Sequence, residues 1–401
     1  MTRVVVAPDK FKGSLTAAQA ASALAAGLGR SRPGLEVLQR PVADGGEGTL
    51  QAVAAAGYRL VPTVATGPHW RPLATRFARL GDAAVIELAA IAGLSLPLPE
   101  EHDPLHATTF GVGQMIRRAL DLGCRRLVLA VGGSATTDGG IGMMHGLGAR
   151  LRERSGAVLS ADSSACTLAH RLDLSAVDPR IRDTEIVLAA DVTNPLFGAD
   201  GAAHTFAPQK GADPHEVELL EARLRQWARL VTEATGVDAA NAPGAGAAGG
   251  VGFAALALLG ATFRRGIDLV IELTGLDLLL ADASLVITGE GSLDAQSLGG
   301  KAPVGIAQAA RSHGVPVVAV AGTTSLTPAE TRAAGFTATY TLTDLEPEPA
   351  RAMARAADLV ECVGARIAEQ HLPRHRQPED LVRDSYITTD CPIPSGPKDN
   401  V

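Results

Sequence analysis

Three lysines stand beside glycines in polar segments of the chain, and this placement indicates binding of an anion. The sequence contains 36 Lys and Arg residues but only five lysines. Lys12, Lys210 and Lys301 lie in the segments Phe-Lys-Gly-Ser, Gln-Lys-Gly-Ala and Gly-Gly-Lys-Ala. An ammonium group is a compact point charge that suits phosphate oxygens, and arginine does not replace it freely. Chance placement in exposed turns explains any one of these lysines, but it explains three together less well.

Five carboxylates lie at or just after predicted strand ends, most of them close to glycine, serine or threonine. They are Asp9, Asp44, Asp191, Glu290 and Asp294. Acidic groups beside anion-binding loops make chemical sense when a divalent cation bridges them to a polyphosphate. One of them could instead accept the proton of an attacking hydroxyl. A role in turns or helix caps explains any single carboxylate, but it explains the set less well.

A glycine-rich loop at residues 132–142 follows a predicted buried strand at 127–131 and leads into a predicted helix at 140–150. Such an order commonly binds an anion, because glycines expose backbone N–H groups and the helix dipole favours negative charge. The candidate phosphate or substrate ligands are Ser14, Gly45, Gly46, Glu47, Gly132, Gly133, Ser134, Thr137, Asp138, Lys210, Gly246 and Lys301.

Three familiar motifs are absent or out of context. The sequence has no G-x-x-x-x-G-K-[ST] segment, which argues against an ordinary P-loop enzyme. Residues 244–249 fit G-x-G-x-x-G but follow Asn-Ala-Pro rather than a strand, which disfavours a nicotinamide dehydrogenase. A helix N-terminus facing a phosphate and a packing turn both remain open for this segment. Two His-x-x-x-His pairs, at 102–106 and 371–375, contain prolines, which disfavours a histidine metal site.

Composition limits the classes of partner. The chain of 401 residues is 46% hydrophobic and 20% charged, as expected of a soluble globular protein with two domains. Its net charge of −7 argues against nucleic-acid and membrane partners. The sequence shows no secretory signal and no apolar run long enough to span a bilayer. Cys124, Cys166, Cys362 and Cys391 are scattered, so we expect reduced thiols in a cytoplasmic protein.

The order of predicted elements indicates an α/β fold with two domains. A β-α-β-α opening predicts a doubly wound parallel sheet, in which ligands bind beyond the carboxyl ends of the strands. Apolar and polar residues alternate at 60–66, 74–80 and 83–88, which predicts an antiparallel sheet. The segment 284–288 is again a buried strand of the kind found in the β-α-β-α opening. We expect one domain from residues 1–58 and 281–370, an inserted domain at 59–280 and a flexible tail at 371–401. Further strands are predicted at 4–7, 35–42, 185–190, 316–321 and 338–342, and helices at 16–28, 111–122, 214–235, 303–313 and 350–370.

Six motifs in order resemble the type 1 glycerate kinases of bacteria. They begin at Ala7, Ala43, Gly132, Pro208, Pro243 and Ile287, and the likeness extends from residue 1 to about 370. The resemblance implies two α/β domains, one of them flavodoxin-like, and phosphorylation of D-glycerate with ATP and Mg²⁺, commonly to 2-phosphoglycerate. The sequence departs from the family pattern at Lys10, where serine is common, and the resemblance does not extend to the tail.

The sequence therefore predicts a phosphotransferase with an alcohol acceptor, specifically an ATP-dependent glycerate kinase that works in a cleft between its domains. Asp191 or Asp44 is the candidate base, Lys12 a catalytic cation, and Glu290 and Asp294 the candidate Mg²⁺ ligands. The alternative is a protein that binds a phosphorylated metabolite without turnover, although the excess of carboxylates argues for a metal and a reaction. The sequence leaves open the 2- or 3-hydroxyl of glycerate, the domain that holds ATP and the oligomeric state.

Overall fold

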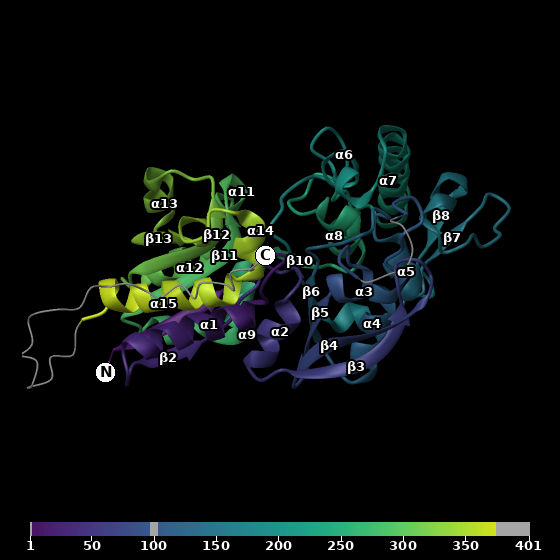
Figure 1. Ribbon diagram of the computed structural model, residues 1–401. Helices are drawn as coiled ribbons and strands as arrows, with labels where there is room; N and C mark the ends of the chain where they lie inside the picture. Colours follow the sequence, from purple (N-terminus) through teal and green to yellow (C-terminus); the bar gives the residue numbers. More distant parts are fainter. Residues whose placement is uncertain (1, 97–102, 374–401) are drawn as a thin grey trace, which may run out of the picture.

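Two β-sheets form the framework of the molecule (Figure 1). The computed structural model describes residues 2–96 and 103–373. Five strands form one sheet in the order β13-β12-β11-β1-β2, and six form the other in the order β10-β9-β6-β5-β4-β3. The described residues include parallel sheets and covering helices, which confirms the predicted α/β class. None of their helices is long and apolar enough to cross a membrane.

The five-stranded sheet is built from both ends of the chain. Its strands are β1 (Arg3–Pro8), β2 (Glu36–Gln39), β11 (Leu285–Leu293), β12 (Val317–Thr324) and β13 (Ala338–Thr341). All four pairings are parallel, and the strand order is the flavodoxin-like one. Strand β1 and residues 285–289 of β11 are buried on both faces, which explains why both segments are mostly apolar.

Helices cover both faces of this sheet. On one face, α1 (Ala17–Ser31) packs against α15 (Ala356–His371), so the purple and yellow ends of the chain lie side by side in Figure 1. Thr16 and Gln19 form the predicted capping box at the start of α1. The other face is covered by α9 (Gly266–Thr274), α10 (Leu276–Leu280) and α12 (Ala302–Ser312).

The prediction of a single C-terminal helix at 350–370 is wrong in one respect. The segment forms two helices, α14 (Pro349–Ala354) and α15, which are separated at Arg355 by a non-helical backbone. Residues 374–401, most of the tail that the sequence predicts to be flexible, lie outside the described residues.

The six-stranded sheet mixes two kinds of pairing. Strand β4 (Pro72–Leu80) pairs antiparallel with both β3 (Arg59–Thr66) and β5 (Ala83–Glu87), as predicted. Strands β6 (Arg126–Ala130), β9 (Glu185–Ala189) and β10 (Thr262–Arg264) then extend the sheet from β5 in parallel. The carboxyl ends of β6 and β9 therefore lie at one edge of the sheet, where the glycine-rich loop begins.

The helices that share the apolar core of the six-stranded sheet are α3 (Ala89–Ala92), α4 (Phe110–Asp121), α5 (Ile141–Gly146), α6 (Ala202–Phe206), α7 (Pro214–Thr235) and α8 (Ala247–Leu258). Helix α7 has the predicted bounds. Helix α5 is shorter than the predicted 140–150, because Gly148 has a φ of 113° and Arg150 starts β7 (Arg150–Arg152), which pairs with β8 (Arg171–Asp173).

Close backbone contacts join the two sheets at the segments that follow β2, β6 and β10. The amide of Gly132 donates a hydrogen bond to the carbonyl oxygen of Gly45 over 3.1 Å. A Cβ atom at Gly45 would lie 2.9 Å from the Cα atom of Gly266, so a side chain there would push these segments apart. Leu50 and Val53 of α2 (Thr49–Ala55) share an apolar cluster with residues of the six-stranded sheet. The division at residues 58 and 281 stays a prediction.

Candidate active site

Four carboxylates converge where the strands of the two sheets end. Asp9 follows β1, Asp44 follows β2, Asp191 follows β9, and Glu290 lies near the end of β11. The negative charge of Asp44 raises the pKa of each of the other three carboxyls, which makes Asp44 their shared neighbour. We call these four residues the strand-end cluster.

The structure corrects the predicted position of Glu290. The sequence predicts a strand that ends near residue 288 and a polar loop after it. Strand β11 instead continues to Leu293, and Glu290 pairs with Ala321 of β12 inside the sheet. Side chains on a strand are held more rigidly than side chains on a loop, so Glu290 has a fixed place in the cluster.

Asp9 is the most deeply buried member of the strand-end cluster, with 6% of its surface exposed. Burial, and next the charge of Asp44, raise its pKa to about 8. The neighbouring Lys10 donates its Nζ proton to the carbonyl oxygen of Glu47 over 2.7 Å. Burial lowers the pKa of Lys10, but the surrounding carboxylates, Asp9 first, outweigh it, and the net shift is upward. Lys10 is thus a cation within an acidic site.

Asp191 and Glu290 each keep one carboxylate oxygen without a hydrogen bond. Oδ1 of Asp191 accepts the amide proton of Gly266, at the N-terminus of α9, over 3.0 Å. Its Oδ2 atom and Oε1 of Glu290 are buried and have no partner among the described residues. Burial, followed for Asp191 by the charge of Asp44, raises the pKa of both carboxyls to about 7. Buried, unpartnered acceptors of this kind are unusual in a resting protein and suit a proton or a cation.

These residues fit a magnesium ion only as a partly hydrated one. Within residues 2–96 and 103–373, no three His, Cys, Asp or Glu side chains are arranged to hold a metal ion. Mg²⁺ commonly binds one or two carboxylates together with water and phosphate oxygens, and the unpartnered oxygen of Glu290 fits that mode. Asp294 differs, because its Oδ1 accepts the amide protons of Gln296 and Ser297 and caps the short α11 (Ala295–Leu298).

The glycine-rich loop is organised around a buried carboxylate. Asp138 is 2% exposed, and burial raises its pKa. Its oxygens accept hydrogen bonds from the amide and hydroxyl of Thr109, at 2.9 and 2.8 Å, and from the amides of Gly140 and Gly142, at 3.0 and 3.1 Å. All of these donors belong to the protein itself. Asp138 therefore holds the loop against the start of α4, rather than presenting a free carboxylate to a ligand.

Lys210 is also directed into the protein. It is 3% exposed, and its Nζ donates to Ser134 Oγ over 3.0 Å and to the Thr136 carbonyl oxygen over 2.6 Å. Burial lowers its pKa to about 7. The hydroxyls of Thr136 and Thr137 are buried, and the described part of the chain offers them no partner. Asp138, Lys210 and the loop residues they bind form a second group, which we call the loop-anchoring cluster.

The other two lysines are more accessible. Lys12 is exposed, and its backbone lies against Gly291, where a Cβ atom would come within 2.9 Å of the Lys12 nitrogen. Ser14 beside it donates its hydroxyl to the carbonyl oxygen of Phe11. Lys301 is the N-cap residue of α12, and its Nζ contacts Gln296 Oε1 over 3.2 Å. Both lysines belong to loops at the β1–β11 end of the five-stranded sheet.

The remaining candidate glycines have a packing role. The amide of Gly246, at the start of α8, donates to the carbonyl oxygen of Asn194, and a Cβ atom there would lie 2.3 Å from the Pro195 oxygen. Gly46 and Gly132 face each other so closely that a Cβ at Gly132 would lie 2.7 Å from the Gly46 Cα atom. Gly133 has a φ of 77°. Such close approaches require glycine at these positions whether or not a ligand binds.

Sequence reasoning missed Glu87. This residue ends β5, is 4% exposed, and accepts the amide proton of Leu50 at the start of α2 over 2.8 Å. Burial raises its pKa, and its charge acts on Lys10. Glu87 is the last residue of β5 and has no glycine, serine or threonine beside it, so the pattern used to select the other carboxylates does not include it.

The α/β fold with carboxylates, lysines and glycine loops at its strand ends defines a class, that of phosphotransferases. The glycerate kinase family model matches residues 4–372. The chain is 43% identical over 326 residues to a glycerate kinase from Bacillus subtilis (strain 168), covering 80% of this chain and 85% of that protein. It is 41% identical over 324 residues to a glycerate 2-kinase from Escherichia coli (strain K12), with coverage of 80% and 85%. A crystal structure described as that of a "putative glycerate kinase 2" from Salmonella typhimurium LT2 aligns with a TM-score of 0.79 and 39% identity, covering 92% of this chain and 97% of that one.

The chain belongs to the glycerate kinase family. It is a kinase that transfers phosphate to an alcohol group of a small molecule, which confirms the class predicted from the motifs.

Proposed function

We propose that this chain transfers the terminal phosphate of ATP to the 2-hydroxyl of D-glycerate, with Mg²⁺, at the strand-end cluster. The observation that carries this proposal is the Oδ2 atom of Asp191, a buried acceptor that no described residue engages. A hydroxyl must lose its proton as it attacks phosphorus, and the base must lie within hydrogen-bond reach of it.

Asp191 is the proposed base. The amide of Gly266 fixes its Oδ1 atom and leaves Oδ2 free to accept a proton. Its pKa of about 7 makes the carboxylate a stronger base than an exposed aspartate near neutral pH. Asp44 is the alternative base, and its charge supports proton uptake by Asp191.

The other residues of the proposed site bind and orient the two substrates and the magnesium ion. Lys12 and Lys301 neutralise phosphate or carboxylate charge from the side of the five-stranded sheet, and Glu290 is the proposed magnesium ligand. When bound, Mg²⁺ neutralises charge on the transferred phosphoryl group. The amides of Gly45 and Gly46, which follow Asp44 in the chain, are proposed as further donors to an anion. Lys210 and Asp138 act at a distance, by holding the glycine-rich loop in place.

The choice of the 2-hydroxyl is supported by a relative, the 41% identical protein named glycerate 2-kinase. The purified protein, mixed with ATP, MgCl₂ and D-glycerate, should release ADP and form one organic phosphate. Phosphorus NMR distinguishes the two products, because the phosphorus of 2-phosphoglycerate couples to one proton and that of 3-phosphoglycerate couples to two. A product whose phosphorus signal is a triplet would overturn the assignment to the 2-hydroxyl. The absence of ADP release would overturn the proposal that ATP is the phosphate donor.

A further inference from the structure

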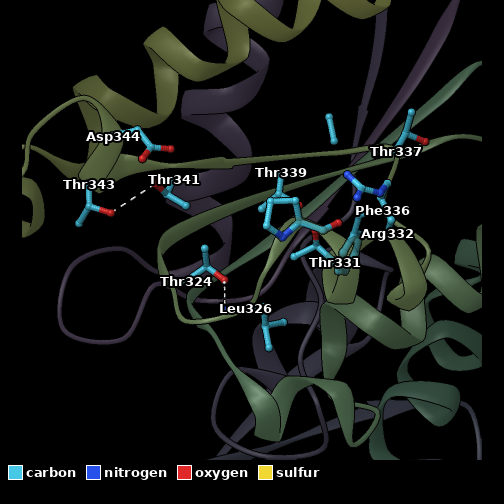
Figure 2. A pocket seen from close by; sticks show the side chains of 12 residues that line it. Thr324, Leu326, Thr331, Arg332, Phe336, Thr337, Thr339, Thr341, Thr343 and Asp344 are labelled. Carbon is cyan, nitrogen blue, oxygen red and sulfur yellow. Dashed lines mark hydrogen bonds between the residues drawn. The ribbon is translucent and has the colours of Figure 1, made fainter.

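A groove lined by threonines lies along β13, at the edge of the five-stranded sheet (Figure 2). Its volume is about 290 Å³. The loop after β12 and helix α13 (Pro328–Ala334) form its other wall. The threonines that line it are Thr324, Thr331, Thr337, Thr339, Thr341 and Thr343. None of these residues belongs to the strand-end cluster or to the loop-anchoring cluster.

The alternation of side chains along β13 produces this polar wall. Residues 337, 339 and 341 point to one face, because successive side chains of a strand alternate. Residues 338, 340 and 342 point to the other face and pack into the apolar cluster of α1 and α15. The apolar face accounts for the position of β13 in the fold, and the opposite face presents a row of hydroxyls to the groove.

One of these hydroxyls lacks a partner. Thr339 Oγ1 is buried, and no described residue forms a hydrogen bond with it. Figure 2 shows Thr339 in the middle of the groove, between Thr341 on one side and Phe336 with Arg332 on the other. A buried hydroxyl without a partner costs free energy, and a rotation of this side chain about χ1 would let the hydroxyl reach a polar ligand in the groove.

Strand β12 separates β13, which carries the groove, from β11, which carries Glu290 of the strand-end cluster. Thr324 pairs with Leu293 of β11, and its Oγ1 donates to the Leu293 carbonyl oxygen over 2.8 Å. Leu293 is three residues beyond Glu290, which corresponds to about 10 Å along a strand. A triphosphate chain can span that distance. A ligand seated in the groove could therefore place its phosphates over β11, near Glu290 and Lys301.

We propose that this groove binds the nucleoside of the triphosphate donor. The volume suits a base and a ribose rather than a whole nucleotide triphosphate, which matches phosphates that lie outside it. Asp344, at the end of the groove, can accept hydrogen bonds from ribose hydroxyls, as acidic residues do in other doubly wound sheets. Arg332 can stack its guanidinium on the base, and threonine hydroxyls can donate or accept.

This inference rests on the proposed use of a nucleotide donor, and binding measurements separate the two. Titration calorimetry with a non-hydrolysable ATP analogue and MgCl₂ should show about tenfold weaker binding for Thr339→Val and for Asp344→Asn. Tripolyphosphate, which lacks a nucleoside, should bind all variants alike. Thr323→Val is the matched control, because Thr323 lies on the neighbouring strand and does not line the groove. Asp344 is exposed, so its variant serves if Thr339→Val does not fold.

The outcomes are distinct. A larger cavity of about 580 Å³ lies beside Glu47 and Gly133 and includes Thr63. If Thr63→Val weakens binding of the analogue while both groove variants bind it within twofold of the parent, the nucleoside lies in that cavity and the proposal is wrong. If the groove variants lose binding but the parent transfers no phosphate from ATP to glycerate, the groove assignment stands and the proposed function fails.

Discussion

The strand-end cluster and the loop-anchoring cluster are both buried and charged, but they differ in how their charges are satisfied. Asp138 accepts four hydrogen bonds and Lys210 donates two, all within the protein. Asp191 and Glu290 each retain an oxygen that meets no donor in the described residues. The first arrangement stabilises a loop, and the second leaves acceptors for a proton or a cation.

The difference has a structural origin. Asp138 lies within a loop whose own amides turn toward it, so the backbone supplies its partners. Members of the strand-end cluster come from four strands in two sheets, and each strand end brings its carboxylate close to another carboxylate. Repulsion of this kind is tolerated in proteins where function requires it. Burial alone does not identify a reactive carboxylate, and neither does one unpartnered oxygen, because Glu221 also has one but pairs with Arg225. Asp191 and Glu290 differ in that their nearest charged neighbours include other carboxylates.

The largest expected effect is on turnover when the unpartnered base is removed. Asp191→Asn keeps the shape of the side chain but cannot accept the proton, so kcat should fall about 10³-fold. Steady-state assays of ADP release measure this. Asp213→Asn is the matched control, because Asp213 only caps α7 and asparagine caps equally well.

Asp44→Asn tests the other candidate. A kcat for Asp191→Asn within a few-fold of the parent, together with a large loss for Asp44→Asn, would transfer the role of base to Asp44. If both variants keep near-parental turnover, neither carboxylate is the base.

Replacing Asp138, which anchors the glycine-rich loop, should instead lower the stability of the folded protein. Asp138→Asn replaces an acceptor oxygen by a donor that faces backbone amides, and the free energy of unfolding should fall by about 3 kcal/mol. Urea unfolding followed by circular dichroism measures the loss. A variant with parental stability and no activity would contradict the comparison, because Asp138 would then act on a ligand.

The sequence predicts the framework well, because its signals are local. The capping box of Thr16 and Gln19, the bounds of α7 and the antiparallel start of the six-stranded sheet all follow from residue types at short spacing. The sequence predicts a loop at Glu290, because the flanking Gly289 and Gly291 are typical of turns. In the structure these glycines allow close packing: a Cβ at Gly289 would lie 2.0 Å from the Val320 oxygen.

The site is predicted only in outline. The sequence selects the strand-end carboxylates, but it does not predict the hydrogen bonds of Lys210 and Asp138 within the protein, and their assignment to a ligand stays a prediction. Which charged groups are paired depends on contacts between residues far apart in the chain, such as Lys210 with Ser134 and Glu87 with Leu50. No spacing rule encodes such contacts, so they can be found only from the folded structure.

A smaller effect on stability is expected to distinguish the buried Lys210 from the more accessible Lys301. Lys210→Met removes two hydrogen bonds to the glycine-rich loop, so the free energy of unfolding should fall by about 1–2 kcal/mol. Lys301→Met, the matched control, removes one contact at the helix start, so it should change stability by less than about 0.5 kcal/mol and raise the KM for ATP. If Lys210→Met behaves like Lys301→Met, Lys210 binds the ligand directly.

The smallest effect is the pH dependence of stability in the substrate-free protein. Asp191 and Glu290 have pKa values of about 7 when folded, above the ordinary range near 4. The folded protein therefore binds more protons than the unfolded chain between about pH 4 and 7, and stability falls as pH rises through this window. Asp191→Asn should reduce the fall in Tm from pH 5 to pH 7 by about 2–4 °C.

Lys210 should act in the opposite direction at higher pH. Its pKa of about 7 lies below the ordinary value, so above pH 7 the unfolded chain binds the extra proton and stability from this residue rises toward pH 10. The Tm difference between the parent and Lys210→Met should therefore widen from pH 7 to pH 9, whereas that between the parent and Asp191→Asn should change mainly below pH 7. Parallel Tm curves for the parent and both variants would show that the two clusters do not differ in the way their hydrogen bonds indicate.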